Sequence, residues 1–155
     1  MDTLLAIPRR LYDLVLAHCL AERPHEAVGF LTGRQGVVRR AVAVRNAHPD
    51  PVRRFRVDPV DALVALRPVE AGDEEWIALY HSHPDSVAYP SPRDLALAEV
   101  WQARGPAGGP AFLFIVSLAS HPPDARAYRL AAGRDPAPVP YRKLDLPDGE
   151  WLDLR

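Results

Sequence analysis

Two histidines separated by one residue, His81 and His83, end an apolar stretch that predicts a β-strand over residues 76–82. Side chains two positions apart on a strand project from the same face, so both imidazoles can bind one cation. Pro84 cannot extend a hydrogen-bonded ladder, so we expect the chain to leave the sheet there. Asp94 follows in the first turn of a predicted helix. Two histidines and one aspartate leave the fourth position of a tetrahedral zinc ion for water, as in catalytic zinc sites.

Hydrolysis at such a site requires two further groups. A carboxylate must take a proton from water and pass it to the leaving amine, and a hydrogen-bond donor must meet the developing oxyanion. Glu26 begins an apolar predicted strand over residues 26–32, where an acid is costly unless it is used. Ser91, three residues before Asp94, is placed to be the donor.

Each part of this pattern also has an ordinary structural explanation. A His-x-His pair arises by chance in a chain with six histidines. The segment from Ser91 to Asp94 is also a helix capping box, and Glu26 can simply pair with an arginine. The functional interpretation rests on the coincidence of all these features at set spacings.

The elements around these residues follow from periodicity and from start and stop signals. Helices are predicted over 8–21, 58–69 and 91–103, the last two after Asp-Pro and Ser-Pro starts. Further strands are predicted over 4–7, 37–45, 111–118 and 125–130. Strands and helices mix without strict alternation, which favours an α/β sandwich around a mixed sheet over a doubly wound parallel sheet.

Composition limits the possible partners. The chain has 155 residues, of which 48% are hydrophobic, as is typical of one globular domain. Its formal net charge of −1 lacks the basic excess of a nucleic-acid-binding protein, so no nucleic-acid partner is expected. The longest apolar run, 111–119, is shorter than the roughly 20 residues that cross a bilayer. We expect neither a membrane partner nor a secretion signal. A single cysteine, Cys19, excludes an intrachain disulfide and fits a reducing compartment, which favours the cytoplasm.

The sequence predicts a compact domain over residues 1–133 and a proline-rich C-terminal tail over residues 134–155. The tail is expected to add one edge strand near residues 139–144. It also carries three apolar side chains, Trp151, Leu152 and Leu154. These are expected to dock on the body of the domain or on a second subunit, which leaves a homodimer open.

Residues outside the motif receive plainer interpretations. Cys19 lies on the apolar face of the predicted helix over residues 8–21, which favours a buried, inert thiol. His18 lacks a partner at ligand spacing and is expected at the surface. A small basic cluster consists of Arg53, Arg54 and Arg56. We interpret this cluster as a solvent-exposed strand face. The alternative is that it binds an acidic carrier protein.

The complete pattern resembles the JAMM (MPN+) metalloproteases. In that family a strand Glu is followed by His-x-His-Pro, six residues, Ser, two residues and Asp. Every position is matched here, by Glu26, His81, His83, Pro84, Ser91 and Asp94. The sequence segments 24–33 and 55–59 are also similar to those of the family. The resemblance covers roughly residues 1–130. One departure is Val28, where bacterial relatives often carry cysteine; we expect only a packing difference.

The resemblance implies a zinc site made by His81, His83 and Asp94, with Glu26 as general acid/base and Ser91 as oxyanion stabiliser. It also implies the deaminase-like α/β/α sandwich of the MPN fold, with a mixed, curved sheet. In its small size the chain is most similar to the compact bacterial branch of the family. Members of that branch cut after the C-terminal Gly-Gly of ubiquitin-like sulfur-carrier proteins. The resemblance therefore implies a zinc-dependent peptidase or isopeptidase whose substrate partner is such a carrier.

Three rival functions are weighed against this one. A non-catalytic MPN interaction scaffold is disfavoured because every ligand position is filled. A nucleobase deaminase needs a Cys-x-x-Cys pair, which a single cysteine excludes. A phage-tail or cell-wall peptidase of the same family stays open, and genomic neighbours distinguish it from a carrier peptidase.

Overall fold

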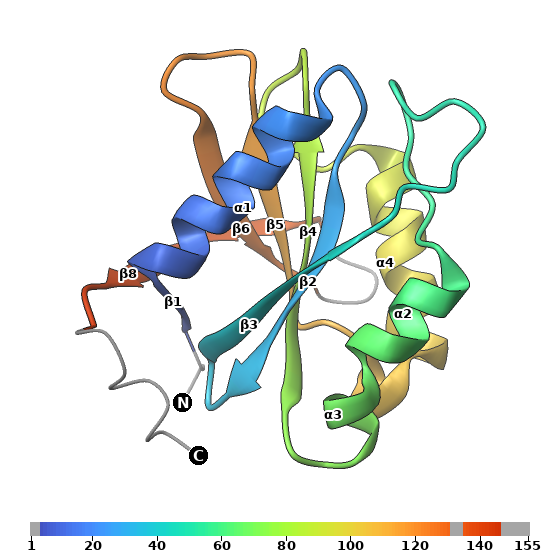
Figure 1. Ribbon diagram of the computed structural model, residues 1–155, viewed down its shortest axis with the longest axis vertical. Helices are drawn as coiled ribbons and strands as arrows, with labels where there is room; N and C mark the ends of the chain where they lie inside the picture. Colours follow the sequence, from blue (N-terminus) through green and yellow to red (C-terminus); the bar gives the residue numbers. More distant parts are fainter. Residues whose placement is uncertain (1–3, 131–134, 147–155) are drawn as a thin grey trace.

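The computed structural model describes residues 4–130 and 135–146 as a layered α/β domain (Figure 1). The strands are β1 (Leu5–Pro8), β2 (Val28–Arg34), β3 (Val37–Val44), β4 (Glu75–His83), β5 (Phe112–Ser117), β6 (Asp124–Arg129), β7 (Ala137–Val139) and β8 (Tyr141–Leu144). The helices are α1 (Arg9–Glu22), α2 (Pro59–Ala65), α3 (Arg67–Glu70) and α4 (Pro92–Arg104), with a 3-10 turn, η1 (Pro106–Gly108). The predicted helix over 58–69 is thus divided into α2 and α3.

The strands form one mixed sheet in the order β7-β6-β5-β4-β2-β3-β1-β8. β2 pairs antiparallel with both β3 and β4, whereas β4 pairs parallel with β5. A parallel pair requires a crossover connection, and α4 supplies it between β4 and β5. The predicted mixed sheet with flanking helices is therefore confirmed. The crossover matters for function because α4 begins just beyond the end of β4 that carries the two histidines.

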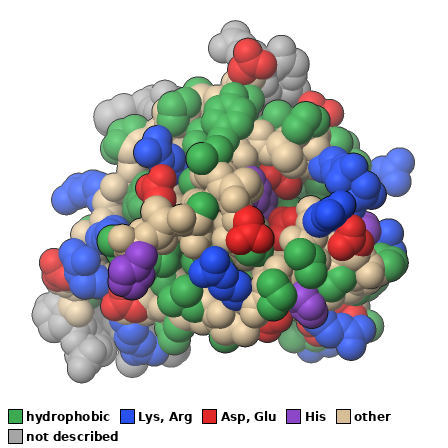
Figure 2. All heavy atoms as spheres, turned by 90° about the horizontal axis from the view of Figure 1, so that it is seen from above, with side chains coloured by type: hydrophobic (Ala, Val, Ile, Leu, Met, Phe, Trp, Pro, Cys, Tyr) green, Lys and Arg blue, Asp and Glu red, His purple; other side chains and the backbone are tan. Residues whose placement is uncertain are grey.

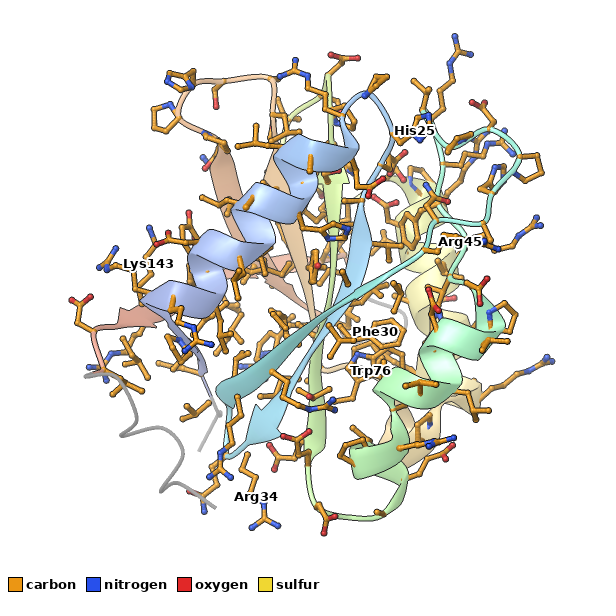
Figure 3. The ribbon with its side chains drawn as sticks, viewed as in Figure 1. His25, Phe30, Arg34, Arg45, Trp76 and Lys143 are labelled. Atoms are coloured by element: carbon orange, nitrogen blue, oxygen red, sulfur yellow. The ribbon has the colours of Figure 1, made fainter. Side chains whose placement is uncertain are left out.

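Each face of the sheet has its own hydrophobic core. α1 lies across one face of the sheet (Figure 1). On this face Tyr12 and Val15 pack with Tyr80 and Phe114 of the sheet. On the other face, residues of α2, α3 and α4 pack against alternate residues of the same strands. Phe30 and Trp76 lie side by side in this second core, with ring centroids 4.7 Å apart (Figure 3). Alternation along β4 therefore decides which side chains meet α1 and which meet α4.

Two helices begin at the caps that the sequence predicts. The Asp58 carboxylate accepts hydrogen bonds from the backbone N–H groups of Val60 and Asp61 at the start of α2. The Ser91 side chain accepts one from the N–H of Asp94, and the Asp94 carboxylate accepts one from the N–H of Ser91. These reciprocal bonds satisfy donors that the first turn of a helix leaves unpaired. The start of α4 is therefore fixed by Ser91 and Asp94, both of which belong to the predicted site.

The described part of the tail extends both edges of the sheet. β7 pairs antiparallel with β6 at one edge, and β8 pairs parallel with β1 at the other. Trp151, Leu152 and Leu154, on which the homodimer prediction depends, lie outside the described residues. Within residues 4–130 and 135–146, no helix combines the length and the apolar character that crossing a membrane requires.

Candidate metal centre

The two histidines stand at the end of the central strand β4. His81 pairs with Ile115 and His83 with Ser117 on the parallel strand β5. The side chain of Ser82, between them, faces the other way and accepts a hydrogen bond from the N–H of Ala27 at 2.8 Å. Because side chains alternate along a strand, the two imidazoles share the face that α4 covers. Their ring centroids are 4.9 Å apart.

Asp94 meets the histidines because α4 begins over the end of β4. The carboxylate oxygen Oδ2 lies 3.5 Å from Nε2 of His81 and 3.1 Å from Nε2 of His83. Ligands at about 2.0–2.1 Å from a tetrahedral zinc ion are roughly 3.3–3.4 Å from one another. Oδ2 of Asp94 is therefore spaced from each histidine nitrogen as two ligands of one ion are.

Together with Glu26, these residues form a buried group whose ligand atoms all lie within 4.8 Å of one another. Figure 2 looks onto this end of the molecule and shows acidic and histidine side chains set into the surface beside basic ones. Oε1 of Glu26 lies 3.7 Å from Nδ1 of His81, and the glutamate is 6% exposed. All four residues that the sequence singles out for the ion and the proton are thus brought together.

His81 supplies an independent indication of a ligand. The residue is 0% exposed, and neither of its ring nitrogens has a hydrogen-bond partner. Leaving a buried polar group unsatisfied costs about 1–3 kcal/mol, so such groups are rare in native proteins. The ring of Phe55 packs against His81 with centroids 4.7 Å apart, which holds the imidazole in place. The donor set and this orphaned imidazole fit a metal ion.

His83 is oriented by the backbone. Its Nδ1 lies 2.7 Å from the carbonyl oxygen of Val87, which accepts a hydrogen bond from that nitrogen. Nε2 then faces Asp94, as expected of a metal-ligating histidine whose other nitrogen is held by a carbonyl. Burial by itself lowers the pKa of His83, but the hydrogen bonds with Asp94 and Val87 outweigh it and raise that pKa. No sequence pattern indicates the part played by Val87, because its backbone carbonyl accepts the hydrogen bond whatever its side chain is.

Asp94 is held in its charged form. Burial by itself raises the pKa of a carboxyl group, but nearby His81, the hydrogen bond with His83 and the N–H of Ser91 lower the pKa of Asp94 well below its ordinary value. Its position in the first turn of α4 also places a negative charge at the positive end of the helix dipole.

The backbone around Glu26 is fastened by a residue that the sequence analysis missed. The side-chain amide of Asn46 donates hydrogen bonds to the carbonyl oxygens of Glu26 and Arg54, both at 2.9 Å. Its side-chain oxygen accepts hydrogen bonds from the N–H groups of His48 and Arg56, both at 3.1 Å. Asn46 is the only asparagine in the chain, and its place next to a predicted strand end was the one available signal.

A cavity of about 600 Å³ opens beside the group. Ser91 lines this cavity next to Asp94, and Glu26 and His83 also contribute to it. The bond from the N–H of Asp94 occupies a lone pair of the Ser91 hydroxyl and leaves its O–H able to donate into the cavity. Ser91 therefore caps α4 and lines the cavity at the same time, and its role as the oxyanion donor stays a prediction.

Two expectations for residues outside the motif have opposite outcomes. Cys19 is fully buried, as predicted, and burial raises the pKa of its thiol to about 12. The surface prediction for His18 was wrong: its side chain is 17% exposed, and Nδ1 lies 2.6 Å from the hydroxyl of Tyr80. The two residues are 62 positions apart, so no local pattern indicates the contact.

Comparisons with known proteins show which family this chain is similar to. A model of prokaryotic homologs of the JAB domain matches residues 8–131. A probable TtuB-protein conjugate cleaving protease from Thermus thermophilus is 42% identical over 91 residues, which cover 59% of this chain and 61% of that protein, less than two thirds of its length. A CysO-cysteine peptidase from Mycobacterium tuberculosis is 31% identical over 131 residues, covering 83% of this chain and 84% of that one.

A solved structure shares the fold at greater sequence distance. The solution structure of a Desulfitobacterium hafniense protein superposes with a TM-score of 0.75 at 23% identity, covering 95% of this chain and 97% of that chain. The matched family model spans most of the chain, including all the residues of the buried group. The family resemblance predicted from the motif is thereby confirmed: the chain belongs to the prokaryotic homologs of the JAB domain.

Proposed function

We propose that this protein is a zinc-dependent peptidase in which His81, His83 and Asp94 hold the metal. The observation that carries the proposal is the buried group of two histidines and two acids with ligand atoms within 4.8 Å. Two imidazoles and one carboxylate are ligands that suit zinc. A zinc ion bound there supplies Lewis-acid activation of water and of the scissile carbonyl.

Glu26 is the general acid/base of this proposal. Its carboxylate lies beside His81 but is not one of the three proposed ligand atoms, which are Oδ2 of Asp94 and Nε2 of each histidine. From that position it takes a proton from the attacking water and delivers it to the leaving nitrogen. Its backbone carbonyl is held by Asn46, so the acid reaches the cavity from a fixed segment just before β2.

Ser91 is the proposed oxyanion donor. The capping box fixes its backbone and its Oγ relative to Asp94. Its O–H donates a hydrogen bond to the carbonyl oxygen as negative charge develops there. A donor that is fixed in advance stabilises the transition state without reorganising.

The proposed substrate is a conjugate of a ubiquitin-like sulfur-carrier protein, cut after its C-terminal Gly-Gly. Two related proteins are named for the cleavage of TtuB-protein conjugates and of CysO-cysteine, which supports this substrate class. Glycine has no side chain, so a diglycine tail enters a cavity of about 600 Å³ without clashes beside the metal ligands. The cytoplasm is the proposed location, because a free buried thiol suits a reducing compartment.

The proposal is tested by cleavage of defined carriers. Zinc content is measured on the purified protein, which is then incubated with TtuB and CysO extended beyond Gly-Gly, and the products are weighed by mass spectrometry. We expect one zinc ion per chain and products that end at Gly-Gly. Removing zinc with a chelator is expected to stop cleavage, and restoring zinc is expected to recover it.

A matched carrier with valine in place of its last glycine is the control, and we expect it to resist cleavage. A zinc-loaded protein that cuts none of the extended carriers contradicts the proposed substrate class. A protein that binds no zinc contradicts the metal site and favours the scaffold alternative.

A further inference from the structure

The cavity beside the metal group has an excess of positive charge. Its charged lining consists of two acids and three arginines, namely Glu26, Asp94, Arg53, Arg54 and Arg93. With histidines counted neutral, the lining carries one net positive charge, and a divalent cation raises this to three. The whole chain has a formal charge of −1, so the excess is local. A site charged in this way attracts an anionic ligand.

The arginines come from two segments that converge on the cavity. Arg53 and Arg54 lie in the connection between β3 and α2, and Arg93 lies in the first turn of α4, directly before Asp94. All three are exposed. Among the described residues, none of the three makes an ion pair with a carboxylate, whereas Arg40 and Arg45 each do. Their guanidinium groups are therefore available to a ligand.

The segment that carries Arg53 and Arg54 is fixed relative to the metal group. The N–H of Glu26 donates a hydrogen bond to the carbonyl of Pro51 at 2.7 Å. Asn46 joins the carbonyl of Glu26 to that of Arg54. The next residue, Phe55, packs on His81. The arginine backbone is thus anchored on both sides to residues of the metal group.

We propose that Arg53, Arg54 and Arg93 form a subsite for the free α-carboxylate of a single amino acid that leaves from the carrier. This inference rests on the proposed peptidase function and narrows its substrate class. Arginine is the side chain best suited to a carboxylate, because its planar fork donates two parallel hydrogen bonds.

Covalent geometry favours this carboxylate over other anions. In an amino acid joined to Gly-Gly, the carboxylate carbon is about 2.5 Å from the scissile nitrogen. Its oxygens must therefore lie in the cavity that holds the reacting bond. A lysine-linked protein places four uncharged methylene groups after its scissile nitrogen. Acidic side chains on the carrier body are separated from the bond by the diglycine tail, which spans up to about 7 Å. The charge of the cavity thus favours an amino acid over a protein as the leaving group.

The test compares two forms of one substrate. TtuB and CysO are each extended beyond Gly-Gly by one alanine, either as the free acid or as the carboxamide. We expect kcat/KM of the zinc-loaded enzyme to be about ten- to a hundredfold higher for the acid, the range of a charge-assisted hydrogen bond. The Arg53→Gln/Arg54→Gln double variant and Arg93→Gln are each expected to bring the ratio of acid to amide towards one. Arg104→Gln, at the far end of α4, is the matched control and should keep the ratio.

The outcomes separate this inference from the proposed function. Equal cleavage of acid and amide by the unmodified enzyme overturns the carboxylate subsite and leaves the peptidase intact. Variants that slow both forms equally also overturn it, because the arginines then contact the carrier body. Cleavage of neither form by the zinc-loaded enzyme contradicts the proposed function itself. The substrate comparison needs no variant, so it holds even if a substituted protein fails to fold.

Discussion

Oδ2 of Asp94 lies 3.1 Å from Nε2 of His83, although one residue lies in the first turn of a helix and the other ends a strand. Nδ1 of the same histidine donates to Val87. In the metal-free protein the imidazole therefore has an acceptor at each nitrogen, which favours its protonated form. A zinc ion must displace the proton from Nε2, because only the neutral imidazole is a ligand.

Zinc affinity is therefore expected to fall as the solution becomes more acidic. The pKa of His83 is raised above its ordinary value, whereas that of Asp94 is lowered, so the aspartate stays charged while the histidine titrates. Below the raised pKa, the apparent affinity should drop about tenfold per pH unit, and above it the curve should flatten. Competition with a chromophoric chelator between about pH 5.5 and 8.5 measures this dependence. An affinity that does not change across that range contradicts the ligand role of His83.

The same shift has a consequence for the stability of the metal-free protein. A raised histidine pKa stabilises the folded state below the unfolded value, and this contribution is lost as the pH rises through the folded pKa. The metal-free protein should therefore lose part of its free energy of unfolding between mildly acidic and neutral pH. Urea unfolding of chelator-treated protein at several pH values measures it. An increase in the free energy of unfolding over this pH range would contradict a stabilising interaction between Asp94 and protonated His83.

Replacing the proposed general acid/base should separate metal binding from turnover. In Glu26→Gln the amide keeps the size of the side chain but cannot accept the proton from water. We expect zinc content to stay at one ion per chain and kcat to fall by about a hundred- to ten-thousandfold. The matched control is Glu99→Gln, an exposed position on α4. A fully active Glu26→Gln enzyme excludes the proposed role.

Ser91→Ala tests the hydroxyl donor against its structural role. Losing a helix cap costs about 0.5–2 kcal/mol of stability, and losing an oxyanion donor reduces kcat by about a hundred- to a thousandfold. Asp58→Ala removes the cap of α2 and supplies the matched control. We expect both variants to lower the melting temperature, with kcat falling only in the serine variant. If the two variants lose activity in proportion to their lost stability, Ser91 is only a cap.

The parts of this site that the sequence predicted are those with local signals. The alternation around His81 and His83 and the Ser-Pro start before Asp94 each fix a local geometry, and the motif then indicates that these geometries meet. The fold class followed in the same way from the order of elements. The contacts of Asn46, Val87 and His18 were not predictable, because each joins a side chain or carbonyl to a distant segment whose position depends on the complete sheet.

Cys19 is expected to resist alkylation in the folded protein. Burial raises the pKa of its thiol to about 12, although a hydrogen bond with Ser82 partly opposes the effect. At about pH 8 the reactive thiolate is then rarer by roughly a thousandfold or more than in an exposed cysteine. Mass spectrometry after iodoacetamide treatment should show no adduct in native protein and one adduct in guanidinium. Rapid labelling of the native protein means that this face of α1 opens in solution.

Asn46 is expected to act as a positioning residue for Glu26. Asn46→Ala removes the hydrogen bonds that tie the segment bearing Arg54 to the carbonyl of Glu26. We expect a loss of about 1–3 kcal/mol of stability and a fall in kcat with zinc content unchanged, because no metal ligand is altered.

The matched control for Asn46 is Thr32→Val. It removes a hydrogen bond from a fully buried hydroxyl to Glu74, at 3.0 Å, at the opposite end of β2. A stability loss of similar size there should leave kcat unchanged when both proteins are assayed well below their melting temperatures. Asn46→Asp keeps the oxygen that accepts from His48 and Arg56 but loses the donation to Glu26, so its kcat should resemble that of the alanine variant. If it instead matches the unmodified enzyme, the donation to Glu26 is not what positions the acid.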